Sequence, residues 1–345
     1  MIRETWQSAE QCRPFFIVGA DRSGTTLLRL MLNRHPMLVI PPESHFLVDL
    51  IRKLPRDGPL SREQVHRATE FITGNPRFSG WKTGAEALAE ELAACRDPTL
   101  AQLIDHVFRL ETGATEKVRW GDKTPLYTTW VSEIGRVFPQ ARFIHIVRDG
   151  RDVSLSLENV RWQGWTEYER ARYWSTVVSH AERAGGRLVA GRFLRVHYEA
   201  LVLRPEATLE QVCAFLGCAM HQEMVTFFET ALSNIPDAEV EAGIHSKLVR
   251  PPRPTDVGRW KTESSSVRVL LFEAVAGRTL QRMTYARRFR GPRRCLVLLT
   301  ASLYIPIGVS VGLVHRLFDG LGEQWQSAIR SNRLLRRLKK VVVRC

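Results

Sequence analysis

FFIVGADRSGTTLLRLMLNRH, residues 15–35, decides the fold of this chain. FFIVG (15–19) is a short apolar run typical of a buried strand, and RLMLNRH (29–35) has the pattern of the helix that follows. Between them, ADRSGTTLL (20–28) is a glycine-containing turn that opens a helix. A helix N-terminus attracts phosphate because its free amides carry partial positive charge. We therefore predict a phosphate-binding turn at residues 20–28.

The residues of this turn indicate which class of phosphate ligand it could bind. It lacks the Gly-Lys-Ser/Thr ending of nucleoside triphosphatases. Gly24 permits close backbone approach, and the amides from Ser23 to Thr26 are expected to face a ligand. Arg22 and the hydroxyls of Thr25 and Thr26 add donors. A Gly-Thr-Thr turn can also simply cap a helix, so the motif needs a second site to support it.

Two further apolar runs, FIHIV (143–147) and FLRVHY (193–198), are each followed by polar turn residues and a helix-like segment. This alternation predicts an α/β fold: a P-loop-like three-layer α/β/α arrangement around a central parallel sheet. Pro205 and Gly217 mark the expected start and stop of one later helix.

The second strand ends in IVRDGRDVSLSL (146–157), which places Arg148 at the carboxyl edge of the sheet and Ser156 eight residues later. In open α/β sheets this edge is where ligands bind. An arginine can fork onto a phosphate, and Ser156 adds a hydroxyl donor. Asp149 and Asp152 fit the simpler role of helix caps.

Net charge separates the chain into two regions. Of the formal +14, residues 287–345 carry +11, with 13 Lys/Arg and two Asp/Glu, which leaves +3 for residues 1–286. The nearly neutral body argues against a broad nucleic-acid surface. We expect a catalytic domain at 1–286 and a basic apolar tail at 287–345.

The tail contains twenty residues without a charge, 295–314, with basic segments on both sides. This segment is long enough to span a bilayer, yet Pro306 and two glycines interrupt it. We expect 287–345 to associate with an anionic membrane surface, and a buried helix is the alternative. Whether 295–314 spans the membrane, lies on it or avoids it stays open.

Six cysteines show neither disulfide density nor metal-ligand spacing, and reduced thiols are expected. The first residues contain no apolar signal segment. We expect a cytoplasmic location, peripheral or anchored at the cytoplasmic membrane face, and the sequence gives no oligomeric state.

The two predicted phosphate sites together resemble the sulfotransferase family that uses 3′-phosphoadenosine 5′-phosphosulfate (PAPS), over roughly residues 14–262. The resemblance implies that Arg22, Ser23, Gly24, Thr25 and Thr26 bind the 5′-phosphosulfate. It also implies that Arg148 and Ser156 bind the 3′-phosphate. Arg22 and the run LLRLMLNRHP are closer to the tyrosylprotein and related bacterial branches of the family.

Two weaker segments agree with this family. VHYEALVLRP (196–205) resembles its Y-E-x-L segment, which implies that Tyr198 lies near the adenine. VGRWK (257–261) resembles its late G-x-W-K segment, which implies that Arg259, Trp260 and Lys261 close over the nucleotide. Residues 234–266 around it have a loop-like composition.

The resemblance also supplies catalytic candidates. Glu43, in PPESHF, lies 21 residues after Arg22, the spacing of the general base in the tyrosylprotein branch. His45 is the other candidate base, since an imidazole has an ordinary pKa near neutrality. Lys123, in RWGDKTPLY, resembles the lysine that stabilises the leaving phosphate oxygen, and Asp122 either orients it or forms a surface ion pair. His145 and His197 lie in predicted strands and fit structural roles.

The predicted reaction moves a sulfuryl group from PAPS to a hydroxyl or phenol acceptor, and no metal is required. The acceptor is a glycan, a glycolipid, a peptide tyrosine or a small molecule. Two alternatives remain: a P-loop-like kinase that uses ATP, and a membrane-bound scaffold without catalysis.

Overall fold

The computed structural model describes residues 13–111, 119–158, 166–230 and 246–289, together with 299, 302, 304, 306 and 308–310. The chain divides into two compact units, Met1–Val147 with His180–Asp256, and Arg148–Ser179 with Val257–Cys345. The boundary at residue 286 stays a prediction.

The first unit contains a five-stranded parallel sheet of order β2-β3-β1-β4-β5. The strands are β1 Phe15–Val18, β2 Leu38–Val39, β3 Arg119–Lys123, β4 Arg142–Val147 and β5 Phe193–His197. Every residue of β1 is fully buried, as expected for a central strand covered on both faces. The predicted α/β fold with a central parallel sheet is confirmed.

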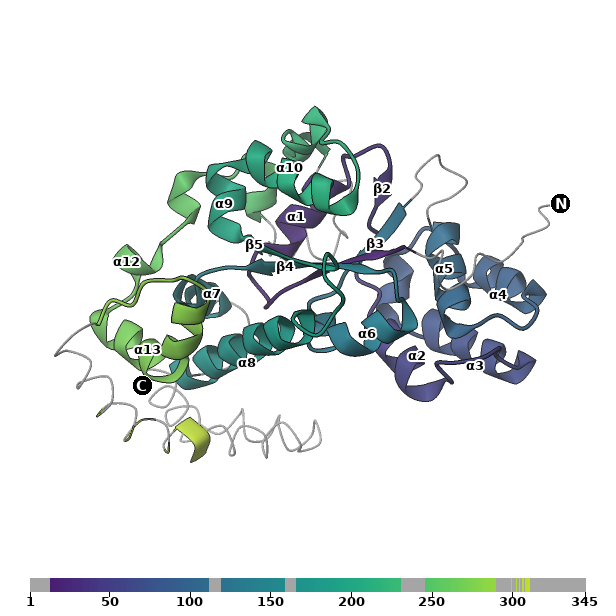
Figure 1. Cartoon of the computed structure of the whole chain (residues 1–345), viewed down its shortest axis with the longest axis horizontal. Coiled ribbons are helices and arrows are strands. Elements are labelled where there is room, and N and C mark those ends of the chain that lie inside the picture. The colour runs from purple at the N-terminus through teal and green to yellow at the C-terminus, as the bar shows by residue number, and fades with distance from the viewer. Residues whose placement is uncertain are drawn as a thin grey trace, which may run out of the picture. The chain divides into compact units, whose positions relative to one another are not determined.

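Helices of the first unit cover both faces of this sheet: α1, α9 and α10 lie on one side and α6 on the other (Figure 1). These helices are α1 Thr25–Leu32, α2 Leu47–Lys53, α3 Arg62–Thr73, α4 Ala85–Ala94, α5 Leu100–Glu111, α6 Val131–Val137, α9 Tyr198–Leu203 and α10 Pro205–Leu216. Short 3₁₀ turns include η1 Pro76–Gly80, η2 Pro125–Thr129, η3 Gln222–Met224, η4 Phe227–Thr230, η6 Ser246–Val249 and η7 Pro254–Asp256.

The described part of the second unit is helical. It contains α7 Gly150–Leu157, α12 Trp260–Glu263 and α13 Ser266–Arg282, and α8 Glu167–Gly185 begins in it and ends in the first unit. The loop expected at residues 234–266 therefore contains short helical turns, and α12 is a correction to that expectation. Residues 234–245 of it lie outside the described chain.

Strand β3 was missed in the sequence because RWGDK carries three charged residues in five. It forms because both of its neighbours, β1 and β2, supply backbone partners and because Trp120 packs into the core. The ring of Trp120 stacks on Phe108 at 4.1 Å and meets Phe16 edge-on at 5.9 Å. Tertiary packing here outweighs the low strand propensity of the charged residues.

Most of the predicted tail, 290–298 and 311–345, lies outside the described residues. Of the described ones, Tyr304 accepts a hydrogen bond at its hydroxyl from the backbone N–H of Tyr168, 2.9 Å away. Among the helices that the structure describes, none has the length and apolar character to cross a bilayer.

Candidate active site

The turn after β1 has the backbone of an anion-binding loop. Arg22 has φ +65° and Gly24 has φ +96°, both in the left-handed region, and α1 begins at Thr25. Alternation of this kind lets successive N–H groups converge on one point. Side chains here lie close: a Cβ on Gly24 would stand 2.4 Å from Cδ2 of Tyr198, so only glycine fits. The hydroxyl of Ser23 is buried and has no hydrogen-bond partner among the described residues.

Tyr198 reaches this turn because β5 ends at His197, at the same edge of the sheet as β1. The structure thus brings Tyr198 together with Arg22–Thr26, two segments that the sequence linked only through the family resemblance. Thr128, fully buried, holds the start of the turn: its hydroxyl accepts from the N–H of Gly19 at 2.8 Å and lies 3.0 Å from the Gly19 carbonyl. No sequence signal marked Thr128.

Glu43 and Lys123 meet at this edge as well. Lys123 is the last residue of β3, aligned with Ile17 of β1, and is 3% exposed. Its ammonium donates a hydrogen bond to Oε1 of Glu43, and Nε2 of His45 lies 2.7 Å from Oε2. Arg77 of η1, 3.7 Å from the same oxygen, was not expected from the sequence. The two candidate bases and the candidate leaving-group lysine therefore form one cluster.

Electrostatics keep Glu43 ionised. Burial raises its pKa, but the charge of Lys123 and the hydrogen bonds from His45 and Lys123 outweigh burial and bring the pKa well below its ordinary value. A carboxylate in this state is negative at every working pH and is a weak proton acceptor while Lys123 remains bound to it.

The loop that carries Glu43 is held at three points. Asn33 exchanges hydrogen bonds with the backbone of Ile40, at 2.7 and 2.9 Å, just before the loop. His45 has φ +52° at the tip of a tight turn closed by the N–H of Phe46 and the carbonyl of Ser44, 2.6 Å apart. Phe46, 1% exposed, anchors the end of the loop in the core.

Asp122 lies behind the cluster and corrects the expectation from the sequence. It is 2% exposed, so it is not part of a surface ion pair, and it accepts hydrogen bonds from the hydroxyls of Ser44 and Thr124. The Ser44 hydroxyl also lies 2.7 Å from that of Tyr127. Burial raises the pKa of Asp122 to about 6, against the opposing effect of these hydrogen bonds. Its role is to hold the Glu43 loop through Ser44.

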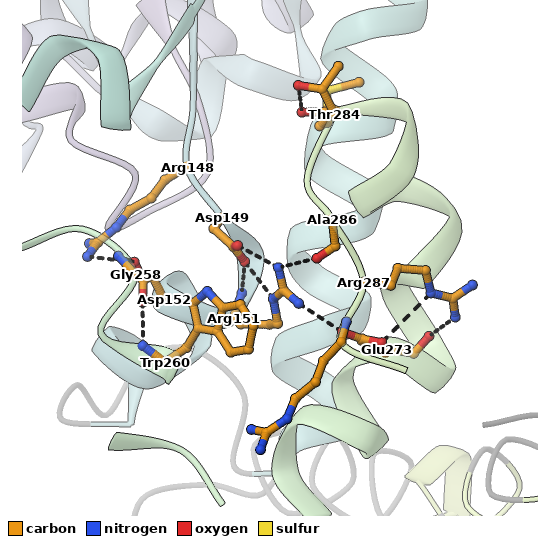
Figure 2. A network of polar contacts seen from close by, with 12 residues as sticks. Arg148, Asp149, Arg151, Asp152, Gly258, Trp260, Glu273, Thr284, Ala286 and Arg287 are labelled. Carbon is orange, nitrogen blue, oxygen red and sulfur yellow. Dashed lines mark hydrogen bonds and ion pairs between the residues drawn. The ribbon is translucent and has the colours of Figure 1, made fainter. Parts of the chain in front are cut away.

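Arg148 belongs to the second unit, two residues before α7 begins. Its side chain points toward Asp152 (Figure 2). Arg148 is 7% exposed, and its Nη2 lies 3.7 Å from Oδ2 of Asp152. Asp152 also accepts hydrogen bonds from the N–H groups of Gly258 and Trp260, at 2.7 and 2.8 Å. Its pKa is raised by burial, with Arg148 and these amides acting against the rise. Asp152 thus ties the 257–261 segment to Arg148, a role the sequence did not indicate.

Asp149 and its partners form the rest of this network (Figure 2). Asp149 caps α7, as expected, by accepting from the N–H of Arg151 at 3.0 Å. The guanidinium of Arg151 also pairs with this carboxylate, reaches the fully buried Glu273 at 2.8 Å and lies over the Trp260 ring. Arg148 is therefore followed by a buried network in which each arginine has a carboxylate partner.

The remaining predicted residues have less distinctive surroundings. Ser156 is half-buried on α7, Lys261 is exposed, and Arg259 pairs with Glu263 one turn along α12. His145, expected to be structural, is fully buried with Nδ1 2.8 Å from Glu182, and burial lowers its pKa. Among the described residues, no group of His, Cys, Asp and Glu side chains is arranged to hold a metal ion.

Comparison with known proteins identifies the family. The profile of the Sulfotransferase family matches residues 14–222. A protein-tyrosine sulfotransferase of Drosophila melanogaster is 26% identical over 71% of this chain and 46% of its own length. Protein-tyrosine sulfotransferase 1 of Danio rerio is 29% identical over 59% of this chain and 52% of its own length. This chain therefore spans about half the length of these curated relatives.

A solved structure agrees on the fold. The sulfotransferase domain from the curacin biosynthetic pathway superposes with a TM-score of 0.55 at 20% identity, over 80% of this chain and 98% of that domain. At this identity the likeness establishes the shared fold alone. The profile match covers well over half of the chain, and with it the prediction of the family is confirmed: the chain belongs to the sulfotransferase family.

Proposed function

We propose that this chain transfers a sulfuryl group from PAPS to the hydroxyl or phenol of an acceptor. The observation that carries the proposal is the buried pair of Lys123 and Glu43 at the carboxyl end of β3. β3 lies directly beside β1, whose own end carries the turn Arg22–Thr26. A cation for a leaving phosphate and a carboxylate for an attacking hydroxyl therefore stand at the same edge as an anion-binding turn.

Each phosphate group of the donor has its own candidate residues. Arg22, the amides of Ser23–Thr26 and the Ser23 hydroxyl, which has no partner within the described part of the chain, suit the 5′-phosphosulfate, since each offers a donor to an anion. Arg148 and Ser156 suit the 3′-phosphate, as the family resemblance implies. Tyr198 suits a place near the adenine, and the 257–261 segment a place over the nucleotide.

In the proposed reaction the acceptor oxygen attacks sulfur in line with the leaving group. Its proton passes to Glu43, the new O–S bond forms, and the bond from sulfur to the 5′-phosphate oxygen breaks. That oxygen gains negative charge, which the Lys123 ammonium stabilises, and adenosine 3′,5′-bisphosphate leaves. A preorganised cation at such an oxygen is worth about 3 kcal/mol of barrier.

The base is Glu43 in this proposal, and His45 is the second candidate because it contacts the same carboxylate. Two variants separate them. Glu43→Gln is expected to lower kcat about 10²- to 10⁴-fold, and His45→Asn much less. If His45 were the base, His45→Asn would instead lower kcat as strongly as expected for Glu43→Gln, and Glu43→Gln would lower it less.

Donor binding is tested by titration calorimetry with adenosine 3′,5′-bisphosphate and with ATP. We expect binding of the bisphosphate and at least tenfold weaker binding of ATP, whereas preference for ATP would support the kinase alternative. Arg148→Gln should raise the KM for PAPS far more than that for the acceptor. Arg183→Gln, an exposed arginine on α8, is the matched control. Failure of the wild-type chain to bind the bisphosphate would overturn the proposal.

The acceptor is proposed from the relatives and from the tail. The fly and zebrafish proteins are named as protein-tyrosine sulfotransferases, which favours a peptide tyrosine. The basic residues of 287–345 favour a lipid-bound acceptor at the cytoplasmic membrane face. Labelled PAPS incubated with fractionated cell extract would show which class takes the label. Sedimentation with anionic vesicles, with and without 287–345, tests the membrane part separately.

A further inference from the structure

The C-terminus of α10 places two cysteines next to each other. Gly217 has φ +79°, the N–H of Cys218 bonds to the carbonyl of Cys213 at 3.0 Å, and the N–H of Gly217 bonds to that of Ala214 at 3.1 Å. These two bonds define a Schellman motif, in which the side chains at the positions of Cys213 and Cys218 frequently contact each other. Here Sγ of Cys218 lies 3.7 Å from the carbonyl oxygen of Cys213. Both cysteines are free thiols in the structure.

The two thiols differ in access. Cys213 is fully buried, with Sγ 3.9 Å from Sδ of Met224, whereas Cys218 is partly exposed. Cys218 is therefore the thiol that a dissolved oxidant can reach. Cys213 is the adjacent thiol that can then react with the oxidised Cys218.

Two guanidinium groups lie at the same helix end. Arg119 donates to the carbonyl of Leu216, and Arg142 donates to that of Phe215. Together with a hydrogen bond from the Cys213 thiol, their charges lower the pKa of Cys218, although burial acts in the opposite direction. The thiolate is the nucleophilic form of cysteine, so this setting favours reaction at Cys218.

We propose that Cys213 and Cys218 form a redox-sensitive pair that is oxidised to a disulfide by a hydroperoxide such as H₂O₂. The Cys218 thiolate attacks one peroxide oxygen, the O–O bond breaks, and the released hydroxide takes up a proton to become water. The Cys213 sulfur then loses its proton and attacks the Cys218 sulfenic acid. The S–S bond forms, the S–O bond breaks, and the oxygen leaves as a second water. The two thiols lose two electrons and the peroxide gains them.

This pair is separate from the proposed active site. Arg119 and Arg142 are the first residues of β3 and β4, so the cysteines lie at the amino edge of the parallel sheet. The turn Arg22–Thr26 and Lys123 lie at its carboxyl edge. Oxidation of the two thiols is therefore independent of sulfuryl transfer, and alkylation of the thiols measures it directly.

The test uses the full chain, reduced, freed of reductant and treated with H₂O₂. Remaining thiols are alkylated with iodoacetamide before tryptic digestion without reductant. Trypsin releases both cysteines in one peptide, 196–247, because Arg204 precedes a proline. We expect this peptide to escape alkylation and to be lighter than its reduced form by two hydrogen atoms, and reductant should restore double alkylation. A linked Cys218 and a different cysteine, or sulfinic acid at Cys218 without a link, would overturn the proposal.

Single-cysteine variants test the role of each thiol. Cys213→Ser should leave Cys218 as a sulfenic acid that dimedone traps, and Cys218→Ser should leave Cys213 reduced. Cys95→Ser, a partly exposed thiol on another helix end, should give the same disulfide yield as the unmodified chain. In the reduced chain at pH 7, Cys218 should be alkylated about three- to tenfold faster than Cys95. Equal rates would refute its role as the attacking thiol.

Discussion

Replacing Lys123 by Met is expected to destabilise the chain by about 3 kcal/mol, because the Glu43 carboxylate would lose its buried counter-charge. Met preserves most of the volume of the lysine stem, so packing changes little. Glu43→Gln should destabilise as well, since it leaves the Lys123 ammonium buried without a carboxylate. The double variant removes both charges and should be more stable than either single variant.

The magnitude follows from burial and from the neighbours of the pair. The side chains of Lys123 and Glu43 are 3% and 18% exposed, so water screens their attraction only weakly. Two unit charges at 4 Å attract by about 4 kcal/mol at an effective dielectric constant of 20, and breaking a buried pair costs about 3 to 5 kcal/mol. His45 and Arg77 stay beside Glu43 and offset part of this loss. We therefore expect the lower end of the range and a coupling free energy of about 2 kcal/mol.

Urea unfolding at pH 7, followed by circular dichroism and tryptophan fluorescence, measures the cycle. Lys82→Met, at an exposed lysine, is the control and should change the free energy of unfolding by less than about 0.5 kcal/mol. A coupling free energy between Lys123 and Glu43 below about 0.5 kcal/mol would refute the conclusion that the two buried charges stabilise each other.

Three further variants test the support of the site. Gly24→Ala places a Cβ against Tyr198 at a positive φ, so it should weaken bisphosphate binding at least tenfold; unchanged affinity by calorimetry would contradict this. The raised folded-state pKa of Asp122 means that its stability contribution is present below about pH 4 and is lost as pH rises through about 6. The free energy of unfolding of the Asp122→Asn variant, relative to that of the unmodified chain, should therefore rise by up to about 3 kcal/mol between pH 4 and 8. A relative free energy of unfolding in urea that does not change with pH would argue against the raised pKa. Asp152→Asn should weaken two charge-assisted hydrogen bonds by about 1.5 to 3 kcal/mol in all, and the amide of Trp260 should exchange its hydrogen faster; identical exchange would exclude the proposed tie.

The parts of the fold that the sequence predicted are those with a local signal. The three apolar runs are strands β1, β4 and β5, and the helix between Pro205 and Gly217 ends where the left-handed glycine stops it. β3 and β2 had no such signal, since their stability comes from strands and aromatic rings distant in the chain. The alternation of apolar and polar residues within β3 cannot reveal that Trp120 packs against Phe108, a residue of another element.

The same distinction holds for the site. Glu43, His45 and Lys123 were found by spacing and resemblance, and the structure adds that they touch. Ser44 and Thr128 support the site through contacts 78 and 109 residues away in sequence, which no local motif encodes. Residues proposed to act on a ligand have charged or titratable side chains at characteristic spacings in the sequence. The residues that position them are ordinary polar residues, and only their buried contacts in the structure show their role.

The pairing of Lys123 with Glu43 has a consequence for the order of events in the proposed reaction. A carboxylate that accepts a hydrogen bond from a buried ammonium is a poor base, because protonation would break that pair. Lysine has three N–H donors, so Lys123 can turn toward a leaving oxygen as negative charge develops there. Each step of that movement weakens its hold on Glu43 and raises the proton affinity of the carboxylate. The base would then gain strength as the acceptor hydroxyl begins to lose its proton, which couples proton transfer to departure of the leaving group through one side chain.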